Sequence, residues 1–192
     1  MKQHNLQKWR TTKSEYLVTD RWIRLRADSC ETPEGHVIEP FYVLEYPDWV
    51  SCVVLSEDLK EITMLHHYRH GIDDFVLELP GGIVDEGESP RQTAEREMNE
   101  ELGLEGATIH EVGSIYANPS FLTNKDFCFV AIGGAYKEQH LEAGDTFQMI
   151  KMPLSELLDK IDDPGNTMQS LHLATIFMAL KFLKKQGHKL SF

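Results

Sequence analysis

Three glutamates, Glu97, Glu100 and Glu101, lie within five residues of one another near the end of a predicted helix. At about 100° of rotation per residue, their side chains fall within an arc of about 100°. Like charges at these spacings destabilise a helix by about 0.2 to 0.5 kcal/mol per pair, and the helix dipole at this end favours cations. A hard divalent cation binds carboxylate oxygens and would remove the repulsion. The cluster therefore predicts a divalent-metal site, and the alternative is a solvated acidic helix face.

The helix that carries these glutamates has marked ends. Ser89 followed by Pro90, with Gln92 three residues after the serine, forms a capping box with proline at the first helical position. Gly103 is a residue typical of the carboxyl-terminal end of a helix. Between them, apolar residues recur every four positions and form a stripe that docks on a core; they are Ala94, Met98 and Leu102. The sequence predicts a helix over residues 90–102 with one apolar and one acidic face.

The spacing of glycine, arginine and glutamate around this helix matches a known motif. Gly82, Glu88 and the run from Arg96 to Leu104 fit G-x5-E-x7-R-E-U-x-E-E-x-G-U, with U apolar, at every specified position. With seven fixed identities at about 7% each, a chance match in this chain is on the order of one in a million. The chain thus resembles the Nudix hydrolases, which cleave a nucleoside diphosphate linked to another group by attack of water at phosphorus, using Mg²⁺ or Mn²⁺.

The resemblance implies which residues bind the metal. Glu97 and Glu101 correspond to the principal ligands, Glu100 to a further ligand, and the backbone carbonyl of Gly81 to a group that completes one coordination sphere. Mg²⁺ or Mn²⁺ is accordingly the expected cofactor.

It also implies which residues support the catalytic glutamates. Arg96 would orient one of these glutamates through a bidentate ion pair, and Glu88 would stabilise the loop before the helix without contacting the metal itself. Gly82 would let the backbone approach the metal and the diphosphate closely.

Features outside the motif resemble the ADP-ribose and nucleoside diphosphate sugar pyrophosphatases. The run Glu78-Leu79-Pro80-Gly81-Gly82 is similar to their E-L-P-A-G, and His67-Tyr68-Arg69 to their Q-Y-R. Pro119 matches a marker proline, although Asn118-Pro119-Ser120 replaces their Ser-Pro-Gly and leaves the sugar or alcohol group open. The resemblance implies a small-molecule substrate and release of a nucleoside monophosphate and a sugar phosphate. The alternatives are GDP-mannose, NADH or a dinucleoside polyphosphate as substrate, a non-catalytic nucleotide sensor, or an acidic interaction domain.

Several further residues are candidates for substrate binding and catalysis. Arg69 is expected to bind phosphate, the alternative being an exposed arginine without that role. Glu78 is expected to belong to the substrate site. Trp49 is expected either to stack on a nucleobase or to be a buried structural tryptophan. In the related enzymes a late loop supplies the general base. In the matching loop 138–145, Glu142 is the expected base and Asp145 a possible metal ligand, the alternative being a solvated acidic loop.

Composition limits the partners of the chain. The 192 residues have 31 acidic and 19 basic side chains, a net charge of −12, which opposes binding to nucleic acid or to an anionic membrane. No apolar run reaches the roughly 18 residues of a membrane span, and the amino terminus lacks a signal-peptide pattern. The three widely spaced cysteines are expected to be buried free thiols in a reducing compartment. These features predict a cytoplasmic protein.

The elements that must position the glutamates form two segments. Residues 1–46 are expected to be a β-rich piece, with strands over 15–19, 22–29 and 37–45 after a loose arm or short helix. The remainder, residues 47–192, alternates strands with helices, the last two helices over 154–161 and 171–186. The prediction is an α/β structure of the mixed α+β type: a Nudix fold in which a mixed β-sheet lies between helices, with a small amino-terminal antiparallel piece. The resemblance implies that this piece forms a homodimer and helps shape the substrate site.

Overall fold

The computed structural model describes residues 6–141 and 146–190. By their internal contacts these residues form two compact units, one made of the chain up to Pro47 together with Tyr116–Asn124, the other of Asp48–Ile115 and the chain from Lys125 onward. The sequence predicts a single boundary after residue 46 and gives no sign that residues 116–124 join the amino-terminal unit.

The amino-terminal unit is built on a three-stranded antiparallel sheet in the order β1-β2-β3. The strands are β1 (Arg10–Thr19), β2 (Arg24–Glu31) and β3 (Val37–Glu45). The amide of Leu44 donates a hydrogen bond to the carbonyl of Phe121 at 2.8 Å, which is how the 116–124 segment attaches to β3. Residues 6–9 have no regular secondary structure, as expected of a loose arm, but the first strand begins at Arg10, inside the dozen residues assigned to that arm.

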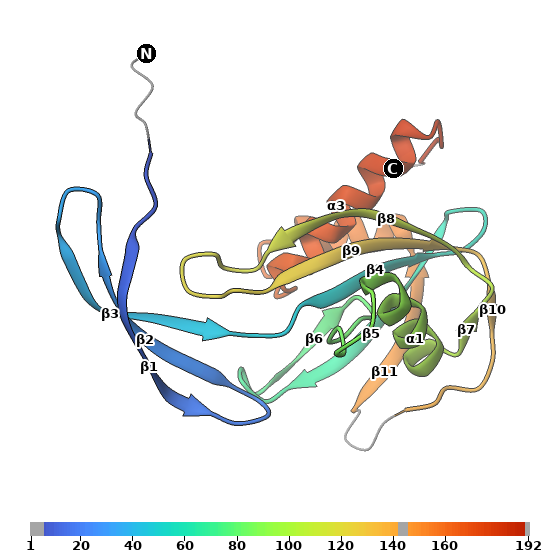
Figure 1. Ribbon diagram of the computed structural model, residues 1–192. Helices are drawn as coiled ribbons and strands as arrows, with labels where there is room; N and C mark the ends of the chain where they lie inside the picture. The colour runs from blue at the N-terminus through green and yellow to red at the C-terminus, as the bar shows by residue number, and fades with distance from the viewer. Residues whose placement is uncertain (1–5, 142–145, 191–192) are drawn as a thin grey trace, which may run out of the picture. The chain divides into compact units, whose positions relative to one another are not determined.

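The larger unit contains a six-stranded mixed sheet, drawn in Figure 1, in the order β11-β5-β4-β9-β8, with β6 paired to β5. Strands β4 and β9 run parallel, whereas β5 is antiparallel to β4, β6 and β11. A short separate ladder joins β7 to β10. The bounds are β4 Trp49–Leu55, β5 Glu61–Arg69, β6 Asp74–Glu78, β7 Leu104–Glu105, β8 Thr108–Tyr116, β9 Lys125–Ile132, β10 Ala135–Tyr136 and β11 Phe147–Pro153.

Helices cover both faces of this sheet. Residues alternate between the two faces along β4, so Val54 packs with the buried residues of α1 (Pro90–Leu102), such as Met98, while Val53 packs with those of the other helices, such as Leu157. Those helices are α2 (Leu154–Asp162) and α3 (Ser170–Lys185). The expected mixed sheet between helices is confirmed.

Two further expectations concern the cysteines and the membrane. Cys30, Cys52 and Cys128 are buried free thiols, as predicted. Within the described residues, no helix combines the length and apolar character needed to cross a bilayer.

Candidate active site

Local sequence fixes the ends of α1, the helix that carries the three glutamates. The hydroxyl of Ser89 accepts a hydrogen bond from the amide of Gln92, and the side-chain carbonyl of Gln92 accepts one from the amide of Ser89 at 2.9 Å, so the predicted capping box is present. At the other end Gly103 adopts a left-handed conformation with φ of 64°. Ala94, Met98 and Leu102 are buried, which leaves the acidic face beside the loop that precedes the helix.

That loop runs along β4 and lies directly against the glutamates. The amides of Val50 and Cys52 donate to the carbonyls of Gly82 and Pro80, each at 2.9 Å. The amide of Gly81 in turn donates to Glu101 Oε2 at 2.9 Å. These hydrogen bonds place the loop backbone between the central sheet and α1.

Neither glycine of this loop can be replaced by a larger residue without movement. A Cβ on Gly82 would lie 2.1 Å from Glu97 Oε1, and a Cβ on Gly81, whose φ is 154°, would lie 2.1 Å from the carbonyl oxygen of Val50. Gly81 therefore needs glycine because the clash is with backbone, whereas a Cβ at Gly82 would displace the carboxylate of Glu97 on the acidic face.

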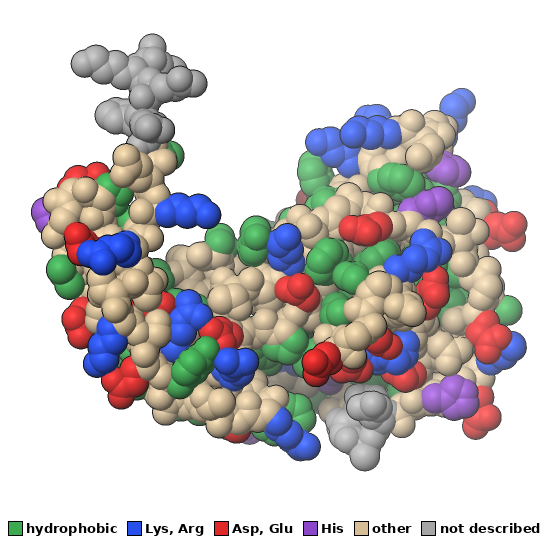
Figure 2. Space-filling view, in the orientation of Figure 1, with side chains coloured by type: hydrophobic (Ala, Val, Ile, Leu, Met, Phe, Trp, Pro, Cys, Tyr) green, Lys and Arg blue, Asp and Glu red, His purple; other side chains and the backbone are tan. Residues whose placement is uncertain are grey.

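A single arginine, Arg96, binds several of the surrounding carboxylates. Its Nη1 lies 2.9 Å from Glu97 Oε1 and 3.0 Å from Glu100 Oε2, while Nε and Nη2 each lie 3.2 Å from an oxygen of Glu88. The resemblance implies a bidentate pair with one glutamate, whereas in the structure the guanidinium lies within 3.5 Å of four carboxylates, the fourth being Asp85. Acidic and basic side chains lie close together over the region of α1 (Figure 2).

The charges around Arg96 shift the pKa values of this cluster. Burial alone would lower the pKa of Arg96, but the hydrogen bond to Glu88 and the charges of Glu97 and Glu100 outweigh it and raise the pKa. The pKa of Glu88 is lowered, first by the hydrogen bond from Arg96 and then by that from Thr93, whose hydroxyl lies 2.8 Å away. The loop and the helix are thus joined by ionised groups over the whole neutral pH range.

The donor set of this face fits a hard divalent cation. Glu97, Glu100 and Glu101 supply only carboxylate oxygens, the ligands that Mg²⁺ and Mn²⁺ prefer, and the missing Cβ of Gly82 lets the backbone approach them. In the described part of the chain, no three carboxylate, imidazole or thiolate groups already converge as ligands of one ion. The reason is visible in the contacts, since Glu97 and Glu100 face Arg96 and Glu101 faces Gly81.

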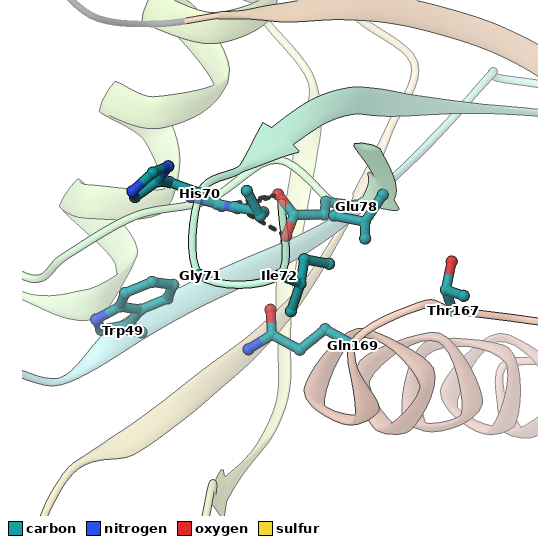
Figure 3. Close-up of a pocket in the computed structure, with 9 residues that line it drawn as sticks. Trp49, His70, Gly71, Ile72, Glu78, Thr167 and Gln169 are labelled. Atoms are coloured by element: carbon teal, nitrogen blue, oxygen red, sulfur yellow. Dashed lines mark hydrogen bonds and ion pairs between the residues drawn. The ribbon is translucent and has the colours of Figure 1, made fainter. Parts of the chain in front are cut away.

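Trp49, Arg69 and Glu78, the three residues proposed from sequence to bind substrate, line one pocket of about 580 Å³ (Figure 3). Arg69 Nε and Nη2 lie 2.9 and 2.7 Å from the two oxygens of Glu78, a bidentate pair. Glu78 is 3% exposed, so its charge is neutralised by Arg69 rather than by water. The pocket adjoins the glycine loop because Glu78 precedes it by three residues and Trp49 forms a bridge with Ile83.

The other wall of this pocket is formed by residues that no sequence motif indicates. Thr167 and Gln169, from the segment that leads into α3, line it opposite the hairpin of β5 and β6 (Figure 3). His172 in the first turn of α3 is buried, and its Nδ1 accepts a hydrogen bond of 3.3 Å from the amide of Leu79. One local feature could have pointed to this wall. Gln169 occupies the N-cap of α3, where Ser, Thr, Asp or Asn is usual, and its side chain makes no capping hydrogen bond.

The remaining candidates from sequence are Glu142, Asp145, Pro119 and His67, the last of which lies beside Glu78. Glu142 and Asp145 fall outside the described residues. Pro119 belongs to the amino-terminal unit. On β5, His66 packs on Phe75 with ring centroids 5.2 Å apart, whereas His67 Nδ1 lies 3.4 Å from Glu78, so the neighbouring histidines face opposite sides of the strand.

Comparisons with known proteins agree with these observations. The NUDIX domain family matches residues 45–170, and the nucleoside diphosphate sugar hydrolase N-terminal domain matches residues 9–44. An ADP-ribose pyrophosphatase of Mycobacterium tuberculosis is 33% identical over 141 residues, which cover 71% of this chain and 67% of the relative. A methanol dehydrogenase activator of Bacillus methanolicus is 29% identical over 156 residues, which cover 80% and 83%.

A solved structure shows the same fold. The crystal structure of an ADP compounds hydrolase matches with a TM-score of 0.82 over 95% of this chain and 97% of that chain, at 20% sequence identity. The NUDIX domain match spans well over half of the chain and includes α1 and the glycine loop. The chain therefore belongs to the Nudix hydrolase family.

Proposed function

We propose that this protein hydrolyses the diphosphate bond of ADP-ribose or a related nucleoside diphosphate sugar in the presence of Mg²⁺ or Mn²⁺, releasing a nucleoside monophosphate and a sugar phosphate. The observation that carries the proposal is the packing of the Gly81–Gly82 loop against Glu97 and Glu101, next to the pocket that holds Trp49, Arg69 and Glu78. Relatives named ADP-ribose pyrophosphatase support the substrate class.

The residues of α1 serve the reaction by holding charge in fixed positions. Glu97, Glu100 and Glu101 would bind the cation, and Arg96, which is itself held by Glu88, contacts Glu97 and Glu100 and limits their movement. A bound divalent cation supplies Lewis acidity and neutralises the diphosphate, which a protein with a net charge of −12 would otherwise repel.

The pocket suits a neutral, polar group attached to the diphosphate. Its one arginine is already paired with the buried Glu78, so the pair adds no net charge to the wall. A second phosphate would gain little there, whereas sugar hydroxyls can bond to the exposed edge of Arg69, which keeps 43% of its side-chain surface exposed, and to Thr167 and Gln169. The Trp49 ring gives such a group an apolar surface to pack on.

We also propose that the amino-terminal sheet pairs with a second copy of the chain. Every residue of β1 is exposed, and because side chains alternate along a strand, Leu17 and Val18 present apolar surface on both faces of this edge strand. Trp22 at the hairpin after β1 is 67% exposed. Apolar exposure of this kind in one small sheet is typical of an interface.

The substrate class can be tested by incubating the purified protein with Mg²⁺ and ADP-ribose, ADP-glucose, GDP-mannose, NADH or diadenosine diphosphate, and identifying products by mass spectrometry. We expect the highest kcat/KM with an ADP-sugar, and incorporation of one oxygen from ¹⁸O-labelled water into one of the two phosphate products. Preference for NADH or the dinucleotide would contradict the proposed substrate class, and preference for GDP-mannose would contradict the expected choice of an ADP-sugar. Tight nucleotide binding without any product would indicate a nucleotide sensor instead of an enzyme.

A further inference from the structure

Residues 135–140, which follow β9, run antiparallel to the end of α1. The ladder of β10 with β7 pairs Ala135 with Glu105 and Tyr136 with Leu104. Beyond this ladder the segment continues antiparallel along the end of α1. The amide of Lys137 donates to the carbonyl of Gly103 at 2.8 Å, and the amide of His140 donates to the carbonyl of Glu100 at 2.9 Å. The segment therefore contacts the helix end at successive positions.

Between these two backbone contacts lies one made by a side chain. The amide group of Gln139 donates a hydrogen bond to the backbone carbonyl of Glu101. The last carbonyls of an α-helix have no partner within the helix. Here the carbonyls of Glu100 and Glu101 both receive donors from the 135–140 segment, and these two residues carry two of the three carboxylates of the acidic face.

The segment is itself held to the central sheet. The hydroxyl of Tyr136 lies 2.5 Å from that of Thr63 on β5, and Lys151 Nζ on β11 lies 3.2 Å from the centroid of the tyrosine ring. The fit against the helix is close, since a Cβ on Gly103 would lie 2.3 Å from the carbonyl oxygen of Lys137. The end of α1 is thereby fixed relative to β5 and β11.

We propose that Gln139 is a positioning residue, which holds the backbone of Glu101 so that its carboxylate stays beside the Gly81–Gly82 loop. This inference rests on the proposed function, because it assumes that the acidic face binds a divalent cation. The backbone contacts of Lys137 and His140 persist whatever the side chains are, so Gln139 is the position at which a substitution removes one of these donors. Displacements of about 1 Å in a catalytic group can cost about 100-fold in rate.

The test compares wild type with Gln139→Met, which keeps the side-chain length and removes the donor. Gln186→Met is the matched control, because Gln186 is an exposed residue at the end of α3. Binding of Mn²⁺ without substrate is measured by calorimetry, kcat and KM for ADP-ribose at saturating Mg²⁺ by product release, and Tm by circular dichroism. For Gln139→Met we expect Kd for Mn²⁺ to rise and kcat to fall, each by roughly 10-fold, with KM unchanged. The control should match wild type in all four values.

The outcomes separate the two proposals. If wild type itself does not bind Mn²⁺, the proposed function fails and this inference with it. If wild type binds Mn²⁺ and Gln139→Met has the same Kd and kcat, the inference alone is wrong. A lower Tm with unchanged Kd and kcat would show that Gln139 only stabilises the fold, and would also overturn the inference.

Discussion

Glu97, Glu100 and Glu101 occupy positions where a helix would ordinarily avoid carboxylates, and the structure shows how their charge is accommodated. Arg96 contacts two of them and Gly81 donates to the third, so each carboxylate has a partner within the site. Such departures from local rules are expected at functional sites. Sequence could identify these residues because the whole motif lies within 23 consecutive positions, from Gly82 to Leu104.

The role of Glu97 can be tested by Glu97→Gln, with Glu95→Gln as control. Glu95 lies on the same helix but faces outward and pairs with Arg91 at 3.0 Å. Loss of a metal-binding carboxylate should lower kcat by at least about 100-fold, whereas the control should keep kcat within about twofold. Circular dichroism should show that both variants fold. Near-normal kcat in folded Glu97→Gln would refute the assignment of this carboxylate.

His172 predicts a pH dependence of stability. Burial lowers its pKa from 6.5 to about 4, with the charge of Glu78 opposing this and that of Arg69 adding to it. Between these two values the unfolded chain binds a proton that the folded chain does not, so stability is complete above pH 6.5 and falls as the pH drops toward 4. At about 1.4 kcal/mol per pH unit, the loss is on the order of 3 kcal/mol.

The variant His172→Gln keeps an acceptor for the Leu79 amide but cannot be protonated. Urea unfolding at several pH values should therefore show a smaller loss of stability between pH 6.5 and 4 in the variant than in wild type. Parallel curves for the two proteins would contradict this account of His172.

At the scale of elements, the sequence predicts the bounds of a helix or strand where residues close to its ends determine them. Helix α1 has the predicted bounds because the capping box and the terminal glycine each act within a few residues. Strand β5, in contrast, runs through His66 and His67 to Arg69, because pairing with β6 and β11 holds these histidines in the sheet. The pocket wall from Thr167 and Gln169 was missed for the same kind of reason, since it faces residues about 90 positions away.

The contribution of the capping box is measurable with Ser89→Ala. The substitution removes the acceptor for the Gln92 amide and should lower the free energy of unfolding by about 1 kcal/mol. Ser170→Ala is the control, because Ser170 is exposed in the first turn of α3 and its N-cap makes no side-chain capping bond. Urea denaturation gives both values. An equal effect of the two substitutions would show that the box contributes nothing specific.

At the scale of the whole molecule, contacts between distant segments determine which parts of the chain belong to one unit, and the sequence does not reveal these contacts. The chain from Tyr116 to Asn124 joins the amino-terminal unit through Leu44, more than 70 residues away, and nothing in either segment indicates that pairing. The expected amino-terminal sheet, in contrast, follows from hairpins whose strands are adjacent in the chain.

The proposed dimer predicts a mass of twice 22.0 kDa by light scattering at micromolar concentration. Leu17→Asp, in the exposed strand β1, should shift the mass toward that of one chain because a charge would be buried at the interface. Phe177→Asp, a similarly exposed apolar position on α3, should leave the dimer intact. A monomeric wild type, or a dimer that survives Leu17→Asp and is lost with Phe177→Asp, would contradict the assignment of this surface.

The central claim is that the acidic face of α1 holds divalent cations against a diphosphate. A crystal structure with Mn²⁺ and a non-hydrolysable ADP-ribose analogue, recorded with anomalous scattering, tests it most directly. The account predicts manganese peaks within about 2.5 Å of carboxylate oxygens of Glu97 and Glu101, with the diphosphate of the analogue bound to the same ions. Analogue bound with no manganese at these two glutamates would contradict it.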